Sequence, residues 1–232
     1  MWEGDAYLKY YKMKIGVITY DKPHRKTQDV VMKLILNGYR DIHLLMIPWI
    51  ERKNHIPIYQ HRPVNCVNLD PCELALALKI RASYLDKTDL SIFDRILIAG
   101  AGIIQVQKAI NSHPGYLPNV RGLDALKWAI YSGQPIGVTT HYISNEVDEG
   151  ELIERRILPI YFEDTFHSVA QRVYETEIEM LVNAITLPSR QSLKDPQYTA
   201  NKRMPHAQEI VMMSRFEQWR KKSPSMHDYL KT

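Results

Sequence analysis

The spacing of apolar positions along the chain alternates between short runs typical of buried strands and the three-to-four repeat typical of helices. Residues 14–20 (KIGVITY) form a β-branched apolar run, which predicts a strand. Residues 27–37 carry their apolar side chains on one helical face and end at the common stop Asn37-Gly38. By the same reasoning we expect strands at 14–20, 42–47, 93–99, 109–111, 137–143 and 152–160, and helices at 27–37, 71–83, 122–131 and 165–185.

The order of these elements predicts the fold class. Strands that alternate with helices favour an α/β fold with a Rossmann-like, mostly parallel sheet flanked by helices. The last two strands are joined by the short turn around 148–150, so we expect them to form a β-hairpin.

The composition changes after residue 188, where Gln, Lys, Ser and Pro dominate. One amphipathic segment follows at about 206–222, in which Ile210, Met213 and Phe216 recur three residues apart. We therefore expect a main domain at 1–188 and a short C-terminal appendage at 189–232 that docks onto it.

The overall composition excludes several classes of protein. The chain has 232 residues, of which 45% are hydrophobic and 24% charged, unlike a fully disordered chain, collagen or a coiled coil. No apolar run reaches the ~18 residues of a membrane-spanning helix, and the first residues lack the pattern of a signal peptide. Cys66 and Cys72 are too few for a disulfide framework and fit no common zinc spacing. We therefore expect a cytoplasmic protein without a metal or a membrane partner.

The positive charge is concentrated at the C-terminal end. The net charge is +4, and residues 189–232 hold nine Lys and Arg against four Asp and Glu. The rest of the chain is close to neutral. The basic segment is either a solvated terminus or a surface for a phosphate-bearing partner, and the charge pattern alone leaves both open. Nucleic acid is not expected, because aromatic residues are not interleaved with the basic ones.

Three polar residues at the ends of predicted elements are candidates for catalysis. Asn111 and His113 lie two apart on a strand-like segment and so point the same way, and Asp148 lies in a loop after a strand. An amide, an imidazole and a carboxylate can together run acyl transfer, since donors stabilise negative charge on a carbonyl oxygen and the carboxylate orients the imidazole or accepts a proton. Each residue also has an ordinary structural explanation, and spacing alone does not bring them together.

Three further residues near these candidates have structural interpretations. His141 lies on a predicted strand, and we expect it to be packed rather than catalytic. Arg121 and Asp124 are expected to start the helix at 122–131, with a contact between Arg121 and substrate left open.

The motif residues resemble a known family. Residues 110–122 (INSHPGYLPNVRG), 137–143 (GVTTHYI) and 146–150 (EVDEG) are similar to the folate-dependent formyltransferases. That family includes glycinamide ribonucleotide formyltransferase, methionyl-tRNA formyltransferase and the amino-sugar N-formyltransferases. Its hallmark is Asn-x-His-Pro-x-x-Leu-Pro with an Asp about 35 residues further on, and the sequence places Asp148 at that distance from His113. Leu97 to Gly100 resembles the end of the strand that precedes the motif.

The resemblance implies a role for each candidate. Asn111 and His113 would hold and polarise the formyl oxygen, and Asp148 would keep His113 protonated and help to move the proton from the attacking amine. A free imidazole titrates near pH ~6.5, so a charged donor at neutral pH needs a nearby carboxylate. The implied formyl donor is 10-formyltetrahydrofolate, released as tetrahydrofolate. The residues implied to bind it are Leu97, Ala99, Gly100, Ile103, Glu146 and Val147.

Departures from the family pattern favour one branch. The stretch at 20–26 lacks the Gly-rich phosphate turn of the glycinamide ribonucleotide enzymes, and the tail is too short for the C-terminal barrel of the methionyl-tRNA enzymes. By elimination, the resemblance implies that the partner is a small-molecule amine, the amino group of a nucleotide-linked amino sugar. Residues 198–205 resemble the C-terminal region of that branch. The alternatives are another amine acceptor (glycinamide ribonucleotide or aminoacyl-tRNA) and a non-catalytic binding module that uses its basic tail; a homodimer is left open.

Overall fold

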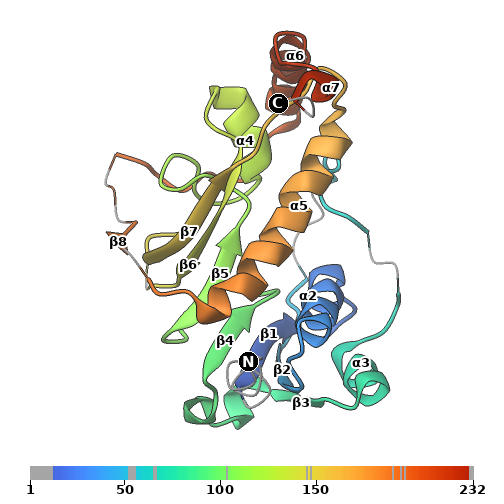
Figure 1. Ribbon diagram of the computed structural model, residues 1–232, viewed down its shortest axis with the longest axis vertical. Helices are drawn as coiled ribbons and strands as arrows, with labels where there is room; N and C mark the ends of the chain where they lie inside the picture. Colours follow the sequence, from blue (N-terminus) through green and yellow to red (C-terminus); the bar gives the residue numbers. More distant parts are fainter. Residues whose placement is uncertain are drawn as a thin grey trace, which may run out of the picture. The chain divides into compact units, whose positions relative to one another are not determined.

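The computed structural model describes residues 13–51, 56–64, 67–102, 104–144, 146, 148–189, 191–193, 195 and 197–229. Within them, one mixed sheet has the strand order β3-β2-β1-β4-β5-β6-β7-β8 (Figure 1). The strands are β1 (Lys14–Tyr20), β2 (Asp41–Ile47), β3 (Arg81–Tyr84), β4 (Arg95–Ile98), β5 (Ala109–His113), β6 (Gly137–Tyr142), β7 (Glu151–Ile157) and β8 (Gln191–Ser192). The strands from β3 to β5 pair in parallel, whereas β7 is antiparallel to both β6 and β8. The predicted α/β fold with a mostly parallel sheet and a β-hairpin is confirmed.

The helices are α2 (Arg25–Leu36), α3 (Pro71–Leu78), α4 (Ala125–Ser132), α5 (Phe166–Asn183), α6 (His206–Arg220) and α7 (Met226–Tyr229), with 3₁₀ turns at Leu85–Lys87, Leu90–Ile92 and Ala184–Thr186. Among the described residues, none of these helices has both the length and the apolar character needed to span a bilayer.

The chain divides into two compact units. The first unit comprises residues 1–53, 64–111 and 181–187, and the second comprises 54–63, 112–180 and 188–232. The contacts therefore group the basic C-terminal segment with residues 112–180. The domain boundary expected at residue 188 stays a prediction.

The core of the first unit forms around β1. Its five inner residues are buried because β1 has parallel neighbours on both sides, β2 and β4. Helix α2 buries Val30, Val31 and Leu34 on one face, as its helical spacing predicts. Apolar burial on both faces of a parallel sheet explains the unbroken apolar run in the sequence.

The helix predicted at 71–83 is too long. Asp70 begins α3 with a capping box to Glu73, but the helix ends at Leu78 because Lys79 adopts the left-handed conformation, with φ 56°. The following residues form β3, which pairs with β2 in parallel, so the prediction was wrong over 79–83. Contacts with a neighbouring strand override the weak helical spacing of this short segment.

The second unit has its core between α4, α5, α6 and β6. Helix α6 packs against α4 (Figure 1). Within this core the rings of Phe216 and Phe166 are 6.0 Å apart. The face of α6 was predicted in part: Phe216 is buried and Met213 packs against the core, but Ile210 is 59% exposed, and Glu209 and Met212 are buried instead.

A buried ion pair explains why a carboxylate occupies the inner face of α6. The Nζ of Lys127 on α4 lies 3.0 Å from Glu209 Oε1, and neither side chain is exposed. The other oxygen of Glu209 accepts the backbone N–H groups of Ile58 and Tyr59 at 2.8 and 3.0 Å. Burial acts to raise the pKa of Glu209, but these N–H donors and Lys127 outweigh it and lower the pKa below its ordinary value. The pair thus joins α4, α6 and the 56–59 segment.

Lys127→Met removes one half of this pair and is expected to destabilise the protein by about 3–5 kcal/mol, because Glu209 is left as an uncompensated buried charge. Urea unfolding measures the change. Adding Glu209→Gln, which removes the charge but keeps a carbonyl oxygen for the backbone donors, should recover part of the loss. A double variant that loses the sum of the two single losses would contradict the coupling.

Candidate active site

The imidazole of His113 is held at the end of β5 by the turn that follows it. Its Nε2 lies 2.9 Å from the carbonyl oxygen of Val120. A Cβ at Gly115 would lie 2.7 Å from that nitrogen and 2.6 Å from the Val120 oxygen, so only glycine lets the backbone pass so close to the ring. Thr139 of β6 fixes the turn, because its hydroxyl donates to the Gly115 carbonyl and accepts the Leu117 N–H.

Asp148 brings its carboxylate to the other ring nitrogen of His113. Oδ2 lies 3.5 Å from His113 Nδ1 and accepts the backbone N–H of Gly122 at 2.9 Å. Both side chains are almost fully buried, at 7% and 9% exposed. Asp148 has φ 56°, an unusual backbone conformation for a residue other than glycine. The structure therefore brings together two residues that lie far apart along the chain.

Both ring nitrogens of His113 thus face oxygen atoms. A neutral imidazole can donate only one proton, whereas the imidazolium donates two. The Val120 carbonyl and the Asp148 carboxylate therefore lie on the two sides of the ring where an imidazolium would carry its two N–H groups.

His141 was expected to be packed, and it is, but it also faces the carboxylate. It is 1% exposed, and its Nε2 lies 3.7 Å from Asp148 Oδ1. Its Nδ1 lies 3.0 Å from the Tyr142 carbonyl, an arrangement that needs the proton on Nδ1 and leaves Nε2 as an acceptor. Burial lowers the pKa of His141, although Asp148 acts to raise it. At this point the register of β6 and β7 shifts, because Thr140 pairs with Glu154 whereas His141 pairs with Leu152.

Asn111 lies on the same strand as His113, two residues earlier. It is partly buried and pairs with Ile98 in the register of β4 and β5. Alternate residues of a strand share a face, so the position agrees with the expectation that both side chains point the same way. Its role stays a prediction.

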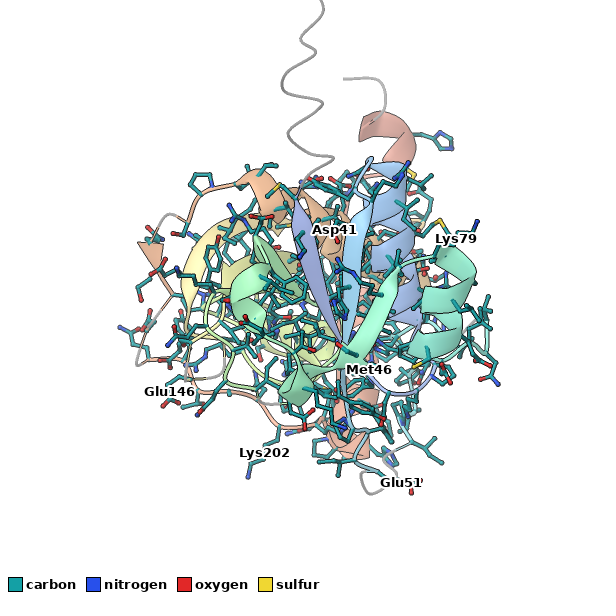
Figure 2. All side chains as sticks on the ribbon, turned by 90° about the horizontal axis from the view of Figure 1, so that it is seen from below. Asp41, Met46, Glu51, Lys79, Glu146 and Lys202 are labelled. Carbon is teal, nitrogen blue, oxygen red and sulfur yellow. The ribbon has the colours of Figure 1, made fainter. Side chains whose placement is uncertain are left out.

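The residues expected to bind the formyl donor have different environments. Leu97 and Ala99 are buried, and the N–H groups of Ala99 and Gly100 both donate to the Ile18 carbonyl. Glu146 is exposed and lies at the periphery in Figure 2. Ile103 and Val147 lie outside the described residues. A role for these positions stays a prediction.

Arg121 does not start a helix as predicted, whereas Asp124 directly precedes α4 as its N-cap residue. Helix α4 begins later, at Ala125, because Gly122 and Asp124 both have positive φ. Arg121 is 6% exposed and forms an ion pair of 2.6 Å with Glu149, the residue after Asp148. Asp124 makes no cap hydrogen bond and instead accepts the backbone N–H of Met204 at 3.0 Å.

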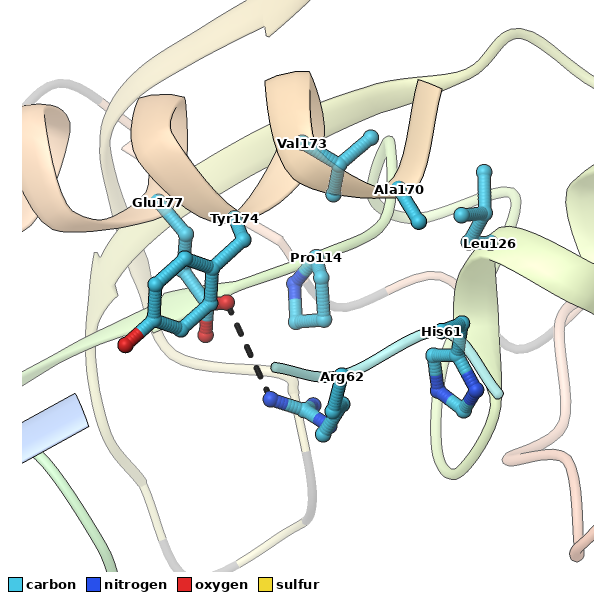
Figure 3. Close-up of a pocket in the computed structure, with 8 residues that line it drawn as sticks. All are labelled: His61, Arg62, Pro114, Leu126, Ala170, Val173, Tyr174 and Glu177. Carbon is cyan, nitrogen blue, oxygen red and sulfur yellow. Dashed lines mark ion pairs between the residues drawn. The ribbon is translucent and has the colours of Figure 1, made fainter. Parts of the chain in front are cut away.

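A pocket in the second unit lies beside Pro114, the residue after His113 (Figure 3). It is lined by His61, Arg62, Pro114, Leu126, Ala170, Val173, Tyr174 and Glu177. Arg62, which is half exposed, lies 3.9 Å from the buried carboxylate of Glu177. Burial, together with Arg62, Lys127 and Arg203, lowers the pKa of His61 to about 3, so this ring is neutral at pH 7. Over the described residues, no group of three or more His, Cys, Asp or Glu side chains could hold a metal ion.

The model of the formyl transferase family matches residues 54–185, which include His113, Asp148 and the pocket. The chain belongs to the formyl transferase family. The resemblance inferred from the motifs is therefore confirmed.

Two curated relatives of this formyl transferase differ in the reaction that they are named for. Phosphoribosylglycinamide formyltransferase of Bacillus subtilis (strain 168) is 29% identical over 126 residues, which cover 53% of this chain and 64% of the relative. dTDP-4-amino-4,6-dideoxyglucose formyltransferase of Mycobacterium tuberculosis (strain ATCC 25618 / H37Rv) is 27% identical over 168 residues, 72% of this chain and 68% of the relative. The match thus spans about two thirds of each relative.

A solved structure has the same fold. WlaRD, a sugar 3N-formyl transferase determined in the presence of dTDP and 5-N-formyl-THF, superposes with a TM-score of 0.57 and 17% identity, covering 92% of this chain and 82% of that chain. At this identity the likeness concerns the fold.

Gly115→Ala is expected to lower turnover about 100-fold, because the added methyl group displaces the His113 ring and misplaced catalytic groups lose rate at that scale. Steady-state kinetics measure the effect, and circular dichroism checks the fold. Gly133→Asn is the matched control, since a Cβ at that glycine meets nothing within 4 Å and Asn tolerates its positive φ. Wild-type turnover in folded Gly115→Ala would show that the ring position does not matter.

His61 makes stability depend on pH. Its pKa is lowered from 6.5 in the unfolded chain to about 3 in the folded protein, so its contribution is complete above pH ~6.5 and is lost as the pH falls towards 3. We expect the Tm of His61→Gln to fall less steeply than that of the wild type between pH 6.5 and 4. The exposed His227 provides the control variant, His227→Gln, which should follow the wild type. Parallel curves for all three proteins would contradict the prediction.

Proposed function

We propose that this protein transfers the formyl group of 10-formyltetrahydrofolate to a primary amine, the amino group of a nucleotide-linked amino sugar. The observation that carries the proposal is the buried pair of His113 and Asp148, 3.5 Å apart, within a chain of the formyl transferase family. The named reactions of the relatives, and the formyl-folate with which WlaRD was determined, support this donor and this class of acceptor.

The donor set suits a formyl group. When bound, 10-formyltetrahydrofolate supplies the formyl carbon to be attacked and leaves as tetrahydrofolate. In this proposal Asn111 offers amide N–H donors to the formyl oxygen, and His113, two residues later on β5, donates to the same oxygen. Both stabilise the negative charge that develops on this oxygen, and buried charges and dipoles act more strongly than they would in water.

Asp148 has two functions in this mechanism. Its negative charge stabilises the imidazolium of His113, and it accepts the proton that the amine loses when the new C–N bond forms. One proton is released by the amine and one is taken up by the departing nitrogen of the donor, so no proton is consumed overall. The His141 ring, whose Nε2 lies 3.7 Å from Oδ1, is uncharged, so it places no second positive charge beside the carboxylate.

The hollow beside Pro114 has room for little more than a water molecule, so we propose it as a contact point at the edge of the acceptor and not as the whole acceptor site. Leu126, Ala170 and Val173 give it an apolar floor, whereas Arg62, Tyr174 and Glu177 offer charged and hydroxyl groups. A sugar ring has both an apolar face and hydroxyl groups, and a mixed lining of this kind suits it. Glycinamide ribonucleotide is the second candidate acceptor, because the Bacillus subtilis relative is named for that class of substrate.

Asn111→Ala, His113→Ala and Asp148→Asn are each expected to lower turnover by about 100-fold or more, because each removes a group that stabilises the transition state or takes up the proton. His167→Ala, which changes an exposed histidine, serves as the control and should keep wild-type turnover. If all three active-site variants turn over at the wild-type rate, the proposed mechanism is wrong.

The acceptor is identified by incubating the protein with 10-formyltetrahydrofolate and, in turn, a dTDP-linked amino sugar, glycinamide ribonucleotide and methionyl-tRNA. Release of tetrahydrofolate with the amino sugar is the expected result. Release with one of the other amines would replace the proposed acceptor, and no release with any of them would count against formyl transfer itself.

A further inference from the structure

The C-terminal segment 198–204, which we call the strap, lies along residues 121–124. Asn201 donates its backbone N–H to the Arg121 carbonyl at 2.9 Å and accepts the Leu123 N–H at 2.9 Å, so that Gly122 and Asn201 form a parallel β-bridge. The side-chain Nδ2 of Asn201 donates to the same carbonyl at 3.1 Å. Farther along the strap, the Lys202 carbonyl accepts the indole N–H of Trp128 at 2.8 Å.

Gly122 contacts both the strap and the carboxylate of Asp148. One side of the residue faces Asn201, where a Cβ would collide with the backbone of the strap. Its N–H donates to Asp148 Oδ2, the oxygen that faces His113. Gly122 also has φ +84°, a conformation that glycine adopts without the strain that a side chain brings. The strap therefore determines the position of Gly122, and the N–H of Gly122 determines the position of the Asp148 carboxylate.

Besides Gly122, Arg121 also connects the strap to the loop that carries Asp148 and Glu149. Its Nη1 donates to the Tyr198 carbonyl at 2.7 Å and pairs with Glu149 at 2.6 Å. Glu149 directly follows Asp148, whose positive φ means that its conformation is maintained by surrounding contacts. The guanidinium is buried, so these contacts are poorly screened by solvent.

We propose that the strap is a positioning element of the active site, and that Arg121 and Asn201 act as positioning residues that hold Asp148 against His113. This inference rests on the proposed formyl transfer, and it assigns the segment after residue 188 a role that does not depend on its positive charge. Arg203 on the strap is about half exposed, and its guanidinium lies 3.7 Å from the buried carboxylate of Asp124.

Arg121→Met keeps most of the aliphatic side chain and removes both contacts. We expect kcat to fall about 10–100-fold with KM for the amine within about twofold, because the hollow beside Pro114 is untouched whereas the carboxylate is displaced. The pH profile of kcat should also differ from that of the wild type, because the contacts around the Asp148 carboxylate have changed. Arg121→Lys, which keeps the charge facing Glu149, should recover part of kcat.

Asn201→Ala tests the strap itself, because it deletes only the Nδ2 contact, and we expect a smaller effect in the same direction. Lys202→Ala is the matched control on the same segment, since Lys202 contributes its backbone carbonyl and its side chain points outward (Figure 2). It should keep the wild-type kcat and pH profile. Thermal unfolding of all variants identifies any that fail to fold.

A readout independent of turnover separates this inference from the proposed function. The Gly122 amide proton, followed by NMR, should move upfield and exchange faster in Arg121→Met and Asn201→Ala as its bond to Asp148 weakens. An inactive wild-type protein with this response would overturn the proposed function and keep the positioning role. An active wild type whose folded Arg121→Met and Asn201→Ala variants keep both the Gly122 signal and the pH profile would overturn the positioning role.

Discussion

The carboxylate of Asp148 is the point on which the candidate active site depends. One oxygen accepts the Gly122 N–H and faces His113, and the other faces His141. A nearly buried carboxylate is costly unless hydrogen-bond donors or positive charge face it, and the Gly122 N–H is the donor to one of its oxygens. The same contacts fix the position of the His113 ring. The groups that stabilise the buried charge are therefore also the groups that set the geometry of the site.

Close backbone approaches make this arrangement rigid. Gly115 leaves room for the His113 ring, and Gly122 fits between Asp148 and the strap. On the far side of α4, the buried pair of Lys127 and Glu209 attaches α6 to the same part of the second unit. The C-terminal segment is thus joined to the catalytic residues by backbone hydrogen bonds and a buried ion pair, which explains why its contacts group it with residues 112–180.

Much of the fold could be predicted because it follows from the spacing of apolar residues within short segments of the chain. The bounds of β1 follow from one apolar run, and the burial of α2 follows from one helical face. The prediction failed at β3 and in part at the inner face of α6, where the deciding partner lies elsewhere in the chain: β2 for the strand and Lys127 for Glu209. His141 was expected only to be packed, and its approach to Asp148 is a tertiary contact that the strand pattern does not contain.

The sequence by itself determined the fold class, the family and the three candidate residues, because a motif and an apolar period are properties of neighbouring positions. Only the tertiary structure decided that Asp148 lies beside His113 and that Arg121 is buried against Glu149, in the loop that carries Asp148. It also decided that the basic C-terminal segment runs beside Gly122. These contacts join residues separated by many positions, and their energies come from burial and hydrogen-bond geometry that exist only in the folded chain.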